Sequence, residues 1–72
     1  MRVDMKGRHR DIQADMAIER LEAGREVTLT SAILKRVLLK TSGIVFHNGH
    51  NYKIAKEHLG VGVYVIKLGR KE

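Results

Sequence analysis

The fold is decided by the stretch SAILKRVLLKTSGIVF, residues 31–46, because its hydrophobic period changes part-way along. Four apolar residues recur at the spacing of a buried helical stripe: Ile33, Leu34, Val37 and Leu38. From Ile44 the period becomes two, which is typical of a strand. Gly43 separates the patterns and suits the left-handed position that follows a helix. The stretch predicts a helix over residues 31–41 followed directly by a strand.

Upstream, the composition of residues 11–24 predicts a second helix that ends near Gly24. Its core face carries Ala14, Ala17, Ile18 and Leu21. Residues 1–10 hold few apolar side chains, so we expect a basic N-terminal arm without fixed structure. Between the helices, we expect a short extended segment over residues 26–29.

The first strand continues into an Asn48-Gly49 turn signal and a return strand over residues 52–56. Two cues for the register disagree. A two-residue turn pairs Phe46 with Asn51, whereas a longer loop pairs Phe46 with Tyr52. We expect the longer loop, because burial of one face usually sets register more strongly than turn preference.

Residues 57–60 are the expected connection to residues 61–68, which give the strongest strand signal, with apolar side chains on both faces. Such a strand is usually covered on both sides, which favours a homodimer in a chain of 72 residues. The expected fold is α+β, a single domain over residues 11–72 with two helices followed by a three-stranded antiparallel sheet. The chain contains no Cys, which excludes disulfides and fits a cytoplasmic protein.

Charge is unevenly distributed along the chain, whose formal net charge is +6. Residues 1–10 carry four cations against one carboxylate, and residues 11–26 carry five carboxylates against two cations. Residues 27–72 carry eight cations against two carboxylates. We expect the cations after residue 27 to share a surface separate from the carboxylates, and a polyanion to bind there.

A basic helix followed by a hairpin suits a reduced winged-helix-like DNA reader, although two helices precede the hairpin rather than three. The helix would enter the major groove, and the hairpin would follow the backbone or the minor groove. At the helix start, free backbone N–H groups would help Thr30 and Ser31 to donate to a phosphate. This predicts a small non-enzymatic regulator that binds nucleic acid, with DNA favoured over RNA. The predicted nucleic-acid contacts are Lys35, Arg36, Lys40, Thr30, Ser31, Lys53, Lys56, Arg8 and Arg10.

The acidic stripe of residues 11–24 supports an alternative function. Stacked carboxylates destabilise an isolated helix, so the stripe calls for a partner. In this alternative the chain is a phage- or mobile-element-type inhibitor that binds a host protein. Its contact residues would be Asp11, Asp15, Glu19, Glu22, Ile12 and Met16. Pairing of the stripe with Arg8, Arg10, Lys53 or Lys56, from the same chain or a neighbouring copy, is the competing structural explanation.

Histidines near the hairpin give a third hypothesis, an RNase-like toxin. His47 or His50 would act as a general base towards a ribose hydroxyl, with Lys53 holding the phosphate. The spacing supports neither a metal site nor a cofactor, because no carboxylate or Cys nearby completes a ligand set. Polar residues at a hairpin tip are the simpler interpretation.

Overall fold

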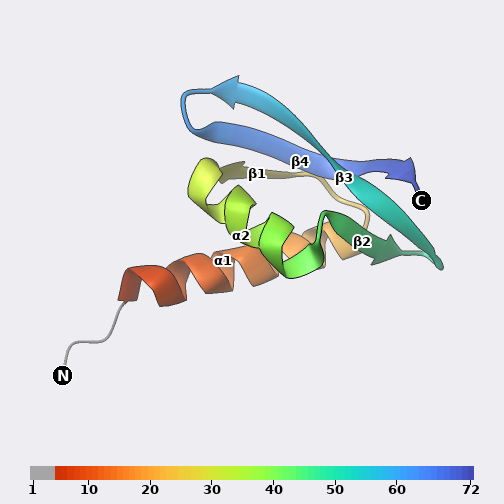
Figure 1. Ribbon diagram of the computed structural model, residues 1–72, viewed down its shortest axis with the longest axis horizontal. Helices are drawn as coiled ribbons and strands as arrows, with labels where there is room; N and C mark the ends of the chain where they lie inside the picture. The colour runs from red at the N-terminus through yellow and green to blue at the C-terminus, as the bar shows by residue number, and fades with distance from the viewer. Residues whose placement is uncertain (1–4) are drawn as a thin grey trace.

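The computed structural model describes residues 5–72 and forms a two-layer α+β fold (Figure 1). The elements in chain order are α1 (Met5–Glu22), β1 (Val27–Thr30), α2 (Ser31–Thr41), β2 (Ile44–His47), β3 (His50–Gly60) and β4 (Val63–Lys71). The α+β class and the two helices are confirmed. The sheet has four strands instead of the expected three.

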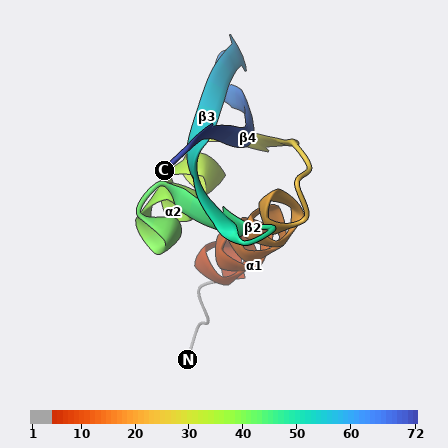
Figure 2. The same cartoon turned by 90° about the vertical axis from the view of Figure 1, so that its right-hand side faces the viewer.

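The four strands form one antiparallel sheet in the order β1-β4-β3-β2. The sheet is curled, and both helices lie against the same face of it (Figures 1 and 2). The end-on view in Figure 2 shows α2 and β1 on opposite sides of the molecule, with α1 below them. The other face of the sheet is left without a helix in the described part of the chain.

β1 corresponds to the extended segment expected over residues 26–29, but its place in the sheet as a fourth strand was not predicted. Val27 and Leu29 are buried, whereas Thr28 and Thr30 are exposed, so the segment alternates as a half-buried strand does. Four residues are too few for this alternation to stand out in the sequence. The segment forms a strand because it pairs with β4, where Val27 lies opposite Ile66.

The predicted register of the first hairpin is wrong. Phe46 lies opposite Asn51, which is the register of a two-residue turn. Asn48 and Gly49 both have positive φ, 51° and 84°, as a type I′ turn requires. Burial did not oppose this turn, because Val45 is the one fully buried residue of β2 while Phe46 is 60% exposed.

The second hairpin is longer than predicted. The segment 57–60, expected to be a connection, continues β3, and the turn falls at Val61-Gly62. Val61 is fully exposed there, so the last strand begins at Val63 instead of residue 61. Pairing between His58 and Tyr64 extends the ladder through this region.

α1 begins at Met5, six residues earlier than the predicted start at residue 11. Residues 5–10 of the expected basic arm are therefore its first turns, and residues 1–4 lie outside the described residues. Lys and Arg are good helix formers and no Pro interrupts this segment, which explains the extension. The bounds of α2 are those predicted, and Ser42 and Gly43 both take left-handed φ after it.

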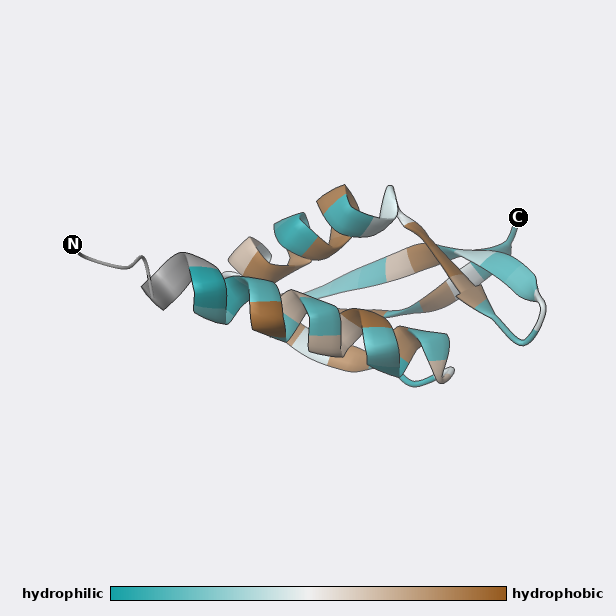
Figure 3. Cartoon of the chain, turned by 90° about the horizontal axis from the view of Figure 1, so that it is seen from below, coloured by the Kyte–Doolittle hydropathy of each residue, from teal (hydrophilic) through white to brown (hydrophobic). Residues whose placement is uncertain are grey.

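The core lies between the helices and the sheet. Leu21 of α1, Val37 of α2 and Ile66 of β4 are its largest fully buried side chains. The predicted helix faces are confirmed, with Ala14, Ala17, Leu21, Ile33, Leu34 and Val37 buried and Ile18 and Leu38 packed against them. Figure 3 shows the outer side of α1 as a mixture of hydrophilic and hydrophobic bands.

We predict that Gly69→Ala destabilises the fold. A Cβ at this position would lie 2.8 Å from the carbonyl oxygen of Lys53 and 2.9 Å from Cβ of Ala55. The free energy of unfolding should fall by about 1–3 kcal/mol, as for other overpacked sites. Urea denaturation measures this. Gly60→Ala is the control, because a Cβ there meets nothing within 4 Å and its loss should be clearly smaller.

Candidate nucleic-acid interface

The start of α2 was predicted to offer free donors to a phosphate. Thr30 is the N-cap, and its side chain accepts a hydrogen bond from the backbone N–H of Ile33 at 3.5 Å. The backbone N–H of Ser31 donates to the carbonyl of Gly62 at 2.9 Å. Two backbone donors at this helix start are therefore used inside the molecule. The Ser31 side chain lies at the surface.

Arg36 and Lys40, two of the three predicted cationic contacts on α2, face the acidic stripe of α1. The guanidinium of Arg36 lies 2.9 Å from a carboxylate oxygen of Asp11. The ammonium of Lys40 lies 2.8 Å from Asp15 and 3.8 Å from Asp11. These side chains are half-exposed, so an ion pair such as Arg36–Asp11 contributes about 0–1 kcal/mol. This pairing accounts for half of the stripe.

The two ion pairs repeat because α1 and α2 run in the same direction. Each hydrogen-bonded pair joins residues 25 apart in sequence, and each helix advances four residues between its two members. Side chains four apart lie on one helix face, so the pairs stack as two rungs. Carboxylates and cations share a surface here, contrary to the expected separation of charge.

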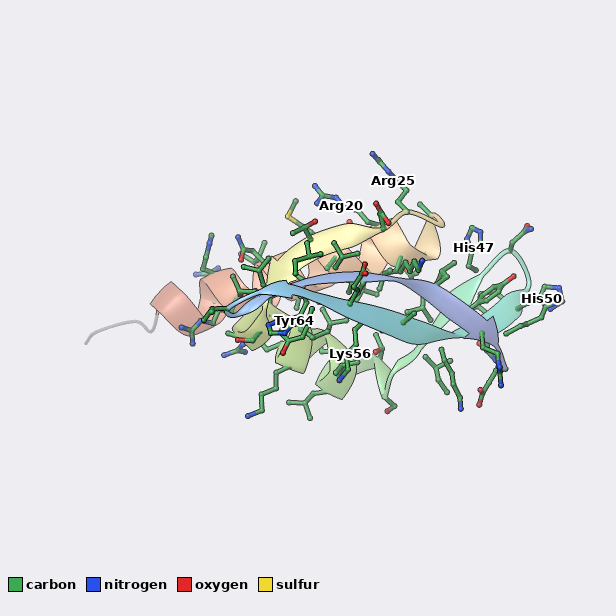
Figure 4. The ribbon with its side chains drawn as sticks, turned by 90° about the horizontal axis from the view of Figure 1, so that it is seen from above. Arg20, Arg25, His47, His50, Lys56 and Tyr64 are labelled. Carbon is green, nitrogen blue, oxygen red and sulfur yellow. The ribbon has the colours of Figure 1, made fainter. Side chains whose placement is uncertain are left out.

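Lys35 and Lys56 lie on the opposite side of α2. Lys35 is exposed and follows Leu34, on the side of the helix turned away from α1. Lys56 lies opposite Ile66 in the β3–β4 ladder, and Figure 4 shows it extending towards α2. Within the described residues neither Lys35 nor Lys56 forms an ion pair, so both charges are available to a ligand.

The structure separates the two predicted lysines of the hairpin. Lys53 lies opposite Ile44, on the sheet face away from the helices, because it is three residues from Lys56 on one strand. Its ammonium is also 3.9 Å from the carboxylate of Glu72. Arg8 and Arg10 are exposed on the first turns of α1. The nine predicted contacts therefore do not form one surface.

An aromatic pair beside Lys56 was missed. The rings of His58 and Tyr64 stack with centroids 4.7 Å apart and an interplanar angle of 23°. Tyr64 and Lys56 extend on the same side of the sheet in Figure 4. The period-two spacing of Ile54, Lys56 and His58 was the available signal, but the segment 57–60 was assigned to a connection.

The two hairpin histidines, His47 and His50, lie at the end of the β2–β3 hairpin, and His47 contacts the backbone of α1. Nδ1 of His47 donates to the backbone carbonyl of Glu22 at 2.6 Å, which ties the first hairpin to the end of α1. His47 and His50 are cross-strand neighbours, and Figure 4 shows both at the far end of the sheet from Lys56. No group of three or more His, Cys, Asp or Glu is placed to hold a metal ion within residues 5–72.

The residues predicted for a protein partner are partly available. Glu19 and Glu22 are exposed, and Ile12 and Met16 are 52% and 47% exposed. Asp11 and Asp15 are engaged by α2, as described above. Half of the acidic stripe is thus ion-paired with α2, whereas Glu19 and Glu22 form no ion pair with the described residues.

Comparison of the chain with protein-family models, curated proteins and solved structures finds no match. Neither helix in the described part of the chain is long and apolar enough to cross a membrane.

We predict that the Lys40–Asp15 pair makes stability depend on alkaline pH. The hydrogen bond to Asp15 raises the pKa of Lys40 above its ordinary 10.5. Its stabilisation is fully present below 10.5 and is lost as pH rises through the higher folded-state pKa. Wild type should exceed Lys40→Gln in urea midpoint at about pH 9, and the gap should narrow as the pH is raised above 10.5. A gap that stays constant over this range would contradict the prediction.

Proposed function

We propose that this protein is a non-enzymatic, cytoplasmic nucleic-acid-binding regulator that prefers DNA to RNA. The observation that carries the proposal is a pair of lysines that form no ion pair with any described residue, Lys35 on α2 and Lys56 on β3, on the side of the molecule away from the acidic rungs. The net charge of +6 favours the approach of a polyanion to that side.

In this proposal the protein contacts nucleic acid in a reduced winged-helix-like manner. α2 approaches with its Lys35 side, and β3 takes the role assigned to the hairpin in the sequence analysis. His58, the exposed member of the stacked pair with Tyr64, supplies an aromatic surface beside Lys56 on which a base can stack. Ser31, Arg8 and Arg10 add contacts at the periphery, while Arg36 and Lys40 hold α1 against α2.

The protein-binding alternative rests on a separate observation. Ile12 and Met16 are half-exposed apolar side chains four residues apart, beside the open carboxylates Glu19 and Glu22. We place it second, because α2 already engages the two carboxylates nearest the start of the stripe. Absence of binding to every nucleic acid in the titration below would make it the leading candidate.

The expected result is salt-dependent binding that weakens in Lys35→Gln and Lys56→Gln. Each variant removes one phosphate contact, so the slope of log affinity against log salt should fall by about one. The measurement is a salt titration with random duplex DNA, single-stranded DNA and RNA. Tighter binding to the duplex DNA supports the order given above.

Lys67→Gln is the matched control for charge. It removes the same charge from the sheet face that carries no helix, where Lys67 lies opposite Ala55. Its salt slope should stay close to that of wild type. Equal losses in all three variants would show that net charge alone attracts nucleic acid, and would reject the Lys35–Lys56 surface.

A homodimer is the remaining part of the proposal. The uncovered sheet face carries Val63, which is 37% exposed, and Val65, which is half-buried. Burying these side chains against a second copy would extend a small core. Sedimentation equilibrium should give about twice the chain mass of 8.2 kDa. A single species at the chain mass at high concentration would exclude the dimer.

A further inference from the structure

β1 leaves one backbone edge open beside α1. It is the terminal strand of the sheet and pairs only with β4 among the described residues. Open edges attract extended chains, and proteins usually protect them with charges, prolines or a covering element. β1 has the sequence Val27-Thr28-Leu29-Thr30, which contains neither a charged residue nor a proline.

The groups that point to the open edge follow from the ladder. The N–H of Ser31 donates to the carbonyl of Gly62, which makes Ser31 and Gly62 a hydrogen-bonded pair. Hydrogen-bonded pairs alternate along an antiparallel ladder, so Val27 and Leu29 exchange bonds with β4. The N–H and C=O of Thr28 and the N–H of Thr30 therefore point away from the sheet.

A groove of about 340 Å³ lies along this edge, between α1 and β1. Its walls include Met16, Gln13 and Arg20 from α1, Val27 and Leu29 from β1, and Ile33 from α2. The groove thus offers aliphatic surface next to unpaired strand donors and acceptors. This combination is what a β-strand needs to bind through its backbone and alternate side chains.

The charge around the groove selects the partner. Of the charged residues that the structure describes, Arg20 lines the groove and no carboxylate does. Arg25 is exposed just before β1, and Figure 4 shows Arg20 and Arg25 extending on the β1 side of the molecule. Glu26 is exposed next to Arg25 but does not line the groove. A partner with carboxylates is therefore complementary, whereas a second copy of this cationic chain would bring its own Arg20 and Arg25.

We propose that the β1 edge binds an extended acidic segment of another protein as an added strand. The segment pairs with Thr28, places apolar side chains in the groove and sets carboxylates near Arg20 and Arg25. This surface lies on the opposite side of the molecule from Lys35 and Lys56, so the inference does not depend on the proposed nucleic-acid function.

The test uses a synthetic peptide of about eight residues, the length of an ordinary strand, with alternating Val and Glu. A peptide with Lys in place of Glu is its control. The acidic peptide should bind and the basic one should not. Binding should also protect the Thr28 amide of the wild-type protein from hydrogen exchange, which reports strand addition at this edge.

Thr28→Pro and Thr28→Val form the matched variant pair. Proline removes the edge N–H without touching the β1–β4 ladder, because the Thr28 N–H points outward. Its affinity for the acidic peptide should fall by about tenfold or more, whereas Thr28→Val keeps the N–H and should bind as wild type does. Circular dichroism checks that Thr28→Pro is folded. If the variant is unfolded, hydrogen exchange at the Thr28 amide of the wild-type protein with bound peptide decides whether the peptide adds to this edge.

Three outcomes overturn the proposal. The first is equal binding of the acidic and basic peptides. The second is an unprotected Thr28 amide in the peptide complex. The third is a Thr28 amide that becomes protected as protein concentration rises without peptide, which would assign the edge to a second copy.

Discussion

The pairing of β1 with β4 joins residues 27–30 to residues 63–66, and the positions of both helices depend on it. β1 runs back along the sheet between the helices, so α1 and α2 point the same way (Figure 1). That direction sets Asp11 and Asp15 beside Arg36 and Lys40 as two rungs. Parallel helices place like ends of their dipoles together, and opposite charges on facing sides offset part of that cost. Leu21, Val37 and Ile66 then fill the space between the layers.

The same arrangement gives the molecule two different flanks. On the α2 flank, Lys35 and Lys56 are unengaged by the described carboxylates and lie near a stacked aromatic pair. On the β1 flank, an open backbone edge borders an aliphatic groove with Arg20 in its wall. The acidic rungs run between these flanks and neutralise Arg36 and Lys40. A protein with a net charge of +6 thereby presents its free charge in separate places instead of over its whole surface.

Helical periodicity predicted much of this fold, because apolar residues that recur every three or four positions can be seen within a single segment of sequence. The bounds of α2 and the buried face of α1 are as expected. Features that depend on two segments were not predictable in this way. Residues 27–30 form a strand because they pair with β4. Likewise, Asp11, the partner of Arg36, lies 25 residues away on another helix. The hairpin register failed for a local reason: Val45 alone is buried in β2, so the Asn48-Gly49 turn met no opposing constraint. Of the predicted site residues, Lys35 and Lys56 share a flank, while Lys53 faces the other side of the sheet.

The long separation between the paired strands has a consequence for biosynthesis. β1 is translated well before β4, and until residues 63–66 leave the ribosome it has no strand to pair with. During that interval Val27 and Leu29 remain without the partner that buries them. The nascent chain can form its helices early, but contacts between distant segments set the pace of completion. Commitment to the native topology therefore waits until residues 63–66 have emerged, and until then β1 is an unpaired strand that can make non-native contacts.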